Sequence, residues 1–257
     1  DAGYMTSDQM GTNDEMDEPH PYRALTLMHS SELNDYFKNN PYNLGALHEN
    51  WVGFSSILDA GVPQLVNEYG WIWLWRDGRP SKLTLNNYNY YLGENATPAQ
   101  CRELQAYWLQ LETEWLRSER SVGGILAFCH LTNNYGFTGD WFINDIKDLQ
   151  PSPAFRFKHC FAPTAVFIDL TDHRYTKHLP ALKPGSDLVF NLVGVNDLNK
   201  DSSGKVLLKL LDEKGTIIST QEESIVIEPF GKRLQPCLLK LPSKAGGYLL
   251  IAEYHEK

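Results

Sequence analysis

The sequence predicts an α/β region followed by an all-β region, within 257 residues. Two observations support this division. All seven tryptophans lie between Trp51 and Trp141, in a part of the chain where helical and strand patterns alternate. Roughly the last hundred residues consist instead of short strand patterns separated by turn signals. We therefore assign residues 1–162 to the α/β region and residues 163–257 to the all-β region.

The α/β region shows the order helix, strand, helix, strand. Apolar residues recur at helical spacing over 47–58, and a short apolar strand follows over 62–66. A polar and aromatic loop is expected to run from there to about Asn95. A second apolar strand is expected over 125–131. Nearly continuous apolar strands that alternate with amphipathic helices predict a parallel sheet covered on its faces.

The helix between these two strands has a clear start signal. Thr97 is its expected N-cap, Pro98 takes the first helical position, and Gln100 completes the spacing of a capping box. One face of this helix is expected to be apolar. That stripe consists of Leu104, Trp108, Leu111 and Trp115.

The all-β region contains seven expected strands, which is typical of an immunoglobulin-like β-sandwich. Residues 201–204 and the pair Lys214-Gly215 have the composition of turns. The expected strands cover residues 165–170, 188–195, 206–211, 216–219, 224–228, 237–241 and 248–254.

The charge and cysteine content exclude several classes of function. The formal net charge is -9, a sign that repels phosphate backbones, so we expect no nucleic-acid partner. The sequence has no apolar run long enough to cross a bilayer, so we expect no membrane partner. The four cysteines form no CxxC pair, so we expect no structural zinc site. We also expect no cofactor.

The segment 65–71 is the most informative part of the sequence for chemistry. Glu68 and Asn67 follow an apolar strand, and Tyr69, Gly70 and Trp71 come directly after. A carboxylate at the carboxyl end of a buried parallel strand lies where barrel enzymes keep their active sites. Aromatic rings next to it offer flat surfaces for the apolar faces of sugars.

Residues 63–71, which read PQLVNEYGW, resemble the seventh-strand nucleophile segment of glycoside hydrolase family 2, the β-galactosidase and β-glucuronidase type. The spacing to the next strand, GGILAFCHL, is also similar to that family. The resemblance implies the last βα units of a (β/α)8 barrel followed by a β-sandwich. Residues 1–162 would then be the C-terminal portion of the barrel.

The resemblance also implies a retaining mechanism with Glu68 as the nucleophile. Its partner, the acid/base carboxyl group, must stand about 5–5.5 Å away. Glu68 could itself be the acid/base, but four more barrel strands would then have to follow, and only one does. A full barrel takes roughly 250 residues, so the early strands and the acid/base are expected in sequence not given. The isolated chain is then expected to be inactive.

The resemblance suggests further residues that would bind substrate. One alternative for the His20 and Tyr22 region is a turn with a packed histidine, and packing of the loop against a barrel is the alternative for the tryptophans. The candidate substrate-binding residues are His20, Tyr22, Asn67, Tyr69, Trp71, Trp73 and Trp141.

Two polar clusters are expected to be structural. Residues 76–78, Arg-Asp-Gly, are typical of a turn held by a local ion pair. On the helix that begins after Thr97, we expect a solvated face with ion pairs at i,i+3 spacing. That face consists of Glu112, Glu114, Arg117 and Arg120.

Two functions from different classes remain open at this point. The first is a retaining glycoside hydrolase that acts on an oligosaccharide or polysaccharide, with a second chain as a possible source of the early barrel strands. The second is a non-catalytic carbohydrate-binding or assembly subunit. The location is unknown, and a secreted or periplasmic protein is compatible with the sequence.

Overall fold

The computed structural model describes residues 64–70, 73–82, 84–118, 120, 122–127, 147–148, 156, 158–170 and 182–257. Contacts divide the chain into two compact units, and their boundary within this part of the chain lies between Cys160 and Phe161. The helix expected over 47–58 lies outside the described residues.

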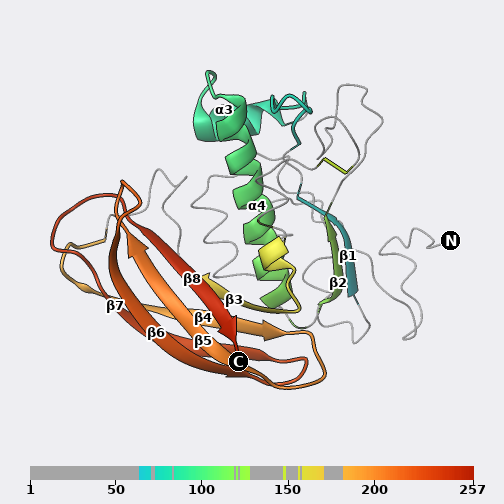
Figure 1. Ribbon diagram of the computed structural model, residues 1–257. Coiled ribbons are helices and arrows are strands. Elements are labelled where there is room, and N and C mark those ends of the chain that lie inside the picture. Colours follow the sequence, from blue (N-terminus) through green and yellow to red (C-terminus); the bar gives the residue numbers. More distant parts are fainter. Residues whose placement is uncertain are drawn as a thin grey trace, which may run out of the picture. The chain divides into compact units, whose positions relative to one another are not determined.

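The first unit contains a parallel pair of strands joined through two helices. Strand β1 (Gln64–Tyr69) is followed by α3 (Leu85–Leu92), α4 (Pro98–Ser118) and β2 (Val122–Ala127). β1 and β2 pair in parallel, as the sequence predicts. Figure 1 shows α4 beside this pair, and residues of α4 contact both strands. The unit thus contains a βαβ arrangement, while a closed barrel stays a prediction.

The start of α4 confirms the predicted capping box. The backbone N–H of Thr97 donates to Gln100 Oε1 at 2.9 Å, and the N–H of Gln100 donates to Thr97 Oγ1 at 3.3 Å. Pro98 is the first residue of the helix. These reciprocal bonds satisfy two backbone donors at the helix start, so the local sequence alone sets where α4 begins.

The middle of α4 is buried more completely than an amphipathic pattern predicts. Residues 104–109 are all buried in succession, including the polar Gln105. Six consecutive buried residues turn through more than a full turn of helix, so every side of this stretch is covered. The expected stripe is confirmed at Leu104 and Trp108, but it is only part of the buried surface.

The expected loop up to Asn95 is wrong over Leu85–Leu92, which forms the helix α3. Asparagine and tyrosine have modest helix propensity, so the local sequence gives little signal. The helix is held by tertiary contacts instead: Tyr88 is fully buried, and Thr84 Oγ1 before the helix donates to the carbonyl oxygen of Trp73 at 2.7 Å. Gly93, with a φ of 85°, ends it.

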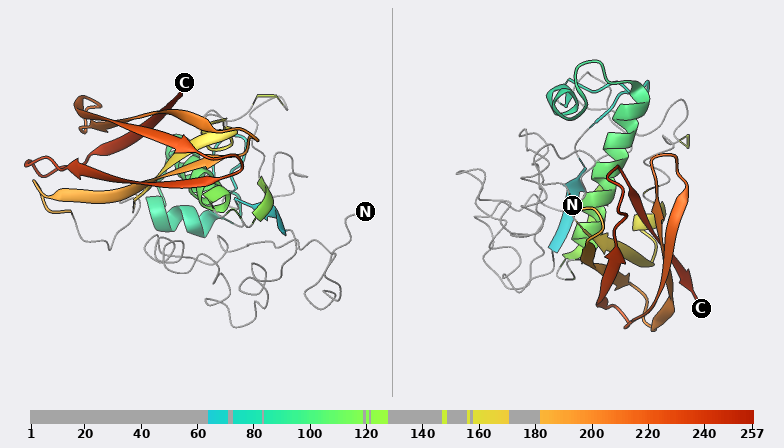
Figure 2. Two further views of the ribbon diagram at one scale, coloured as in Figure 1. Left: turned by 90° about the horizontal axis from the view of Figure 1, so that it is seen from below. Right: turned by 90° about the vertical axis from the view of Figure 1, so that its left-hand side faces the viewer.

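The second unit is a sandwich of two three-stranded antiparallel sheets, with strand orders β3-β4-β7 and β6-β5-β8. Buried side chains from β4, β5, β6 and β7 form one hydrophobic cluster between the sheets. Figure 2 shows the two layers of strands from two further sides. The strands are β3 (Thr164–Asp169), β4 (Asp187–Asn196), β5 (Ser202–Leu211), β6 (Ile217–Ile227), β7 (Lys232–Lys240) and β8 (Leu249–Glu256).

Two expectations for this unit are wrong. A turn was expected over 201–204, but residues 202–204 begin β5 and pair with the neighbouring strands, and Gly204 lies close to the carbonyl oxygen of His255 and the ring of Tyr254 on β8. Residues 216–219 and 224–228 were expected as separate strands but belong to one strand, β6, paired along its length with β5. The turn at Lys214-Gly215 is confirmed.

We expect the buried core of the sandwich to dominate the stability of this unit. Leu208 is 1% exposed, so Leu208→Ala should lower the free energy of unfolding by about 2–5 kcal/mol. Leu238 is 55% exposed, so the same change there should alter it by less than about 1 kcal/mol. Urea unfolding followed by circular dichroism measures both. Equal losses for the two variants would contradict the packing described.

Candidate functional site

Strand β1 carries a β-bulge at the position of the candidate nucleophile. Val66 pairs with Ile125 and Tyr69 pairs with Ala127, so β1 advances by three residues while β2 advances by two. Because of this extra residue, Val66 and Tyr69 both lie on the side of Leu116 of α4 and form one buried cluster with it. Positions 67 and 68 lie in the bulge, next to the carboxyl end of the strand.

The tyrosine after the bulge is held by a buried hydrogen bond to α4. Tyr69 is 1% exposed, and its hydroxyl lies 2.6 Å from Thr113 Oγ1. Thr113 uses its only hydroxyl proton to donate to the carbonyl oxygen of Leu109 at 2.6 Å, so Tyr69 is the donor. Burial raises the pKa of the Tyr69 hydroxyl well above its ordinary value.

The glycine that follows is also held by α4. Gly70 has a φ of 84°, in the left-handed region, and its backbone N–H donates to the carboxyl group of Glu112. A Cβ at position 70 would lie 2.3 Å from Leu109 Cδ2, so any residue larger than glycine would have to displace the Leu109 side chain. Tyr69 and Gly70 are therefore both fixed to the same face of α4.

Glu112 was expected on a solvated face, and this is wrong. Although part of its side chain is exposed, its Oε2 atom is buried and has no hydrogen-bond partner among the described residues. Burial raises the pKa of Glu112 to about 8, and the bond from Gly70 offsets only part of this effect. Burial therefore favours the protonated form of this carboxyl group in the folded state.

Arg117 contradicts the same expectation. It is 8% exposed, and its guanidinium donates to the carbonyl oxygen of Cys160. Burial raises the pKa of the Cys160 thiol to about 12, and the charge of Glu114 acts in the same direction.

The sequence contains one signal for the face of α4 that packs against the end of β1. This signal is the i, i+3, i+4, i+7 spacing of Leu109, Glu112, Thr113 and Leu116.

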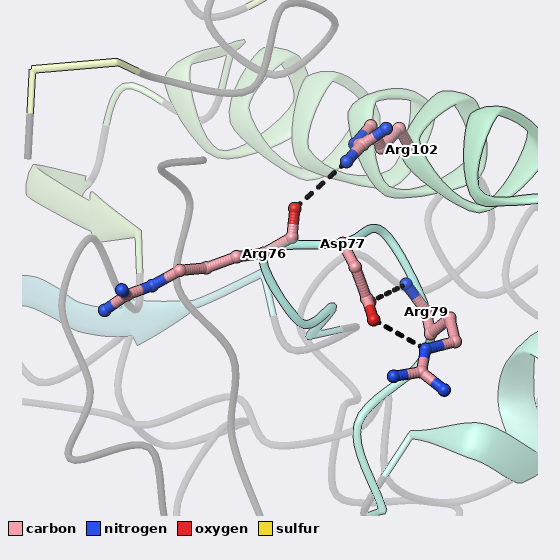
Figure 3. Close-up of polar contacts among 4 residues, drawn as sticks. All are labelled: Arg76, Asp77, Arg79 and Arg102. Atoms are coloured by element: carbon pink, nitrogen blue, oxygen red, sulfur yellow. Dashed lines mark hydrogen bonds and ion pairs between the residues drawn. The ribbon is translucent and has the colours of Figure 1, made fainter. Parts of the chain in front are cut away.

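The expected turn after the strand is confirmed and is held by an ion pair. Asp77 accepts from the backbone N–H of Arg79 at 2.9 Å and from its Nε at 2.6 Å (Figure 3). Burial alone would raise the pKa of Asp77, but the bonds from Arg79 outweigh it and keep that pKa below its usual value. Arg102 of α4 donates to the carbonyl oxygen of Arg76 at 3.0 Å, which ties the turn to the helix.

The predicted substrate-binding residues differ in their burial and in whether the structure describes them. Tyr69 and Trp73 are buried, and the carbonyl of Trp73 accepts hydrogen bonds from Thr84 Oγ1 and from the N–H of Ser81. Asn67 belongs to the bulged part of β1. The structure thus brings Asn67, Glu68 and Tyr69 together on one strand, and their roles toward substrate stay predictions. His20, Tyr22, Trp71 and Trp141 lie outside the described residues.

The described residues contain no group of three or more His, Cys, Asp or Glu side chains placed to hold a metal ion. Cys101, Cys160 and Cys237 are buried thiols. Among the same residues, none of the helices has both the length and the apolar character that a membrane crossing requires.

Comparisons with known proteins give distant structural likenesses. No protein-family model and no curated protein matches the chain. A β-D-mannosidase from Dictyoglomus thermophilum is 14% identical with a TM-score of 0.48, and the match covers 84% of this chain and 28% of the mannosidase. An alkylpurine DNA glycosylase from Pseudomonas fluorescens is 9% identical with a TM-score of 0.23, over 68% of this chain and 50% of the glycosylase. Likenesses at this level assign no family.

The raised pKa of Glu112 predicts a pH-dependent stability. Between its ordinary pKa of 4.5 and about 8, the folded state keeps the proton and the unfolded state loses it. The free energy of unfolding should therefore fall as pH rises through this window, by up to roughly 1.4 kcal/mol per pH unit. Glu112→Gln should remove this contribution. Urea unfolding of both proteins at pH 5, 6, 7 and 8 measures it, and parallel pH profiles would contradict it.

The close contact at Gly70 predicts a larger loss there than positive φ alone produces. Gly93 has nearly the same φ, 85°, and nothing within 4 Å of an added Cβ. The ψ of Gly93 is 164°, a backbone region that is almost exclusive to glycine at positive φ, so Gly93→Ala should cost about 1–3 kcal/mol of stability from backbone strain alone. Gly70→Ala should cost a further 1–3 kcal/mol, roughly, because Leu109 must move. Thermal unfolding compares the two, and an equal loss would show that the helix does not press on Gly70.

Proposed function

We propose that this chain carries the nucleophile of a retaining glycoside hydrolase and that Glu68 is this residue. One observation carries the proposal: Glu68 is the penultimate residue of β1, a strand that pairs in parallel with β2 and has a bulge at this position. Carboxyl ends of parallel strands are the positions that barrel enzymes use for catalysis, and bulges are frequent next to active sites.

In this mechanism the Glu68 carboxylate attacks the anomeric carbon of the sugar while the bond to the leaving oxygen breaks. The leaving oxygen takes a proton from a second carboxyl group, and a glycosyl ester with Glu68 forms. That second group then removes a proton from water, which attacks the same carbon, releases Glu68 and restores both carboxyl groups. The configuration at the anomeric carbon is retained because it inverts twice.

The remainder of the proposed site follows from the sequence. Asn67 and Tyr69 flank Glu68, and His20, Tyr22, Trp71, Trp73 and Trp141 are proposed to contribute substrate contacts. The acid/base carboxyl group is proposed to come from outside this chain, either from preceding sequence or from a second polypeptide. The substrate is an oligosaccharide or polysaccharide, and the mechanism itself requires no metal or organic cofactor.

Substitution of Glu68 in the full protein tests this function. Glu68→Gln removes the nucleophile but keeps the shape of the side chain, so turnover of an activated aryl glycoside should fall at least about 10³-fold. Glu94 is exposed in a turn of the same unit, and Glu94→Gln should leave turnover unchanged. Mass spectrometry with a slow fluorinated glycoside should find the sugar attached to the peptide that contains Glu68.

Two results would overturn the proposal. Turnover by Glu68→Gln within a few-fold of the unmodified protein would show that another group attacks the sugar. Calorimetric binding of oligosaccharides without any turnover by the full protein would instead support a non-catalytic carbohydrate-binding subunit.

A further inference from the structure

One face of α4 packs against the end of β1 and against Gly70, the residue that follows it. Leu109, Glu112, Thr113 and Leu116 follow each other at i, i+3, i+4 and i+7, so they lie on one side of the helix. Leu116 packs on Val66 and Tyr69, and Thr113 accepts from the Tyr69 hydroxyl. Leu109 lies against Gly70, and Glu112 accepts from its N–H.

Burial of the Glu112 carboxyl group costs hydration free energy, so another contact is needed to explain why a glutamate stands here. Its Oε2 atom is buried and makes no hydrogen bond within the described part of the chain. An apolar side chain of the same length would avoid the loss of hydration. Unlike an apolar side chain, a carboxyl group can accept a hydrogen bond from the N–H of Gly70.

That acceptor acts on a backbone position that is hard to hold otherwise. Gly70 has a left-handed backbone and no side chain of its own to anchor it. It follows Glu68 with only Tyr69 in between, and Tyr69 is already fixed by Thr113. A hydrogen bond to the N–H of Gly70 therefore removes the remaining freedom of the peptide units that follow the candidate nucleophile.

We propose that Glu112 is a positioning residue: by accepting the N–H of Gly70 it fixes the turn after β1 and thereby sets how Glu68 is presented to the sugar. This inference rests on the proposed function of Glu68. A displacement of the attacking atom by about 1 Å can reduce a rate roughly 10²-fold, so fixing the adjacent backbone has a direct effect on turnover.

Two substitutions of similar size separate positioning from packing. Glu112→Met fills the same space but has no acceptor for the N–H of Gly70, whereas Glu112→Gln keeps a carbonyl oxygen there. In the full protein, Glu112→Met should lower kcat about 10- to 100-fold with KM within roughly threefold. Glu112→Gln should keep kcat within a few-fold of the unmodified protein. Glu103→Met, at an exposed position of the same helix, is the control and should change neither constant.

Hydrogen exchange supplies a readout that does not depend on catalysis. The amide of Gly70 should exchange at least about tenfold faster in Glu112→Met than in the unmodified protein, and Glu112→Gln should restore its protection. Unchanged exchange in Glu112→Met would overturn the anchoring itself. Faster exchange with unchanged kcat would overturn its effect on Glu68.

The proposed function can fail separately from this inference. If Glu68→Gln remains active, Glu68 is not the nucleophile, and the kinetic part of the inference falls with it. The exchange of Gly70 in Glu112→Met and Glu112→Gln still decides whether Glu112 holds the turn. If Glu68→Gln is inactive and Glu112→Gln is as impaired as Glu112→Met, a neutral acceptor is insufficient and the positioning role as stated is wrong.

Discussion

The first unit depends on the attachment of the end of β1 to α4. Two hydrogen bonds, from the Tyr69 hydroxyl to Thr113 and from the N–H of Gly70 to Glu112, join the last residue of the strand and the residue after it to adjacent positions of the helix. The helix in turn begins at a defined residue because of its capping box. A local signal at Thr97 thus sets the register of a helix that orients the strand end carrying Glu68.

The sequence predicted those features whose causes are local. Thr97, Pro98 and Gln100 specify the start of α4 without help from distant residues. The Arg-Asp-Gly-Arg turn forms its ion pair between residues two apart. The order of β1, α4 and β2 and the parallel pairing of β1 with β2 also follow from periodicity and length, because they depend on the pattern of apolar residues rather than on any single contact.

Features caused by distant contacts were missed, and they include the most informative parts of the candidate site. Glu112 looked solvated because its burial comes from the chain around α4 and not from neighbours in sequence. α3 was missed because Tyr88 and Thr84 hold it through tertiary contacts. The first residues of β5 resembled a turn because the fit of Gly204 to Tyr254 is visible only once β5 and β8 are paired.

The bulge in β1 determines which side chains of this strand point toward α4. In a regular strand, residues three apart point to opposite faces of the sheet, so Val66 and Tyr69 share a face only because the bulge takes up one extra residue between them. If β1 paired with β2 without the bulge at its present length, Tyr69 would turn away from Thr113. The contact between the end of β1 and α4 therefore depends on the register of β1 against β2 as well as on the side chains that the strand carries.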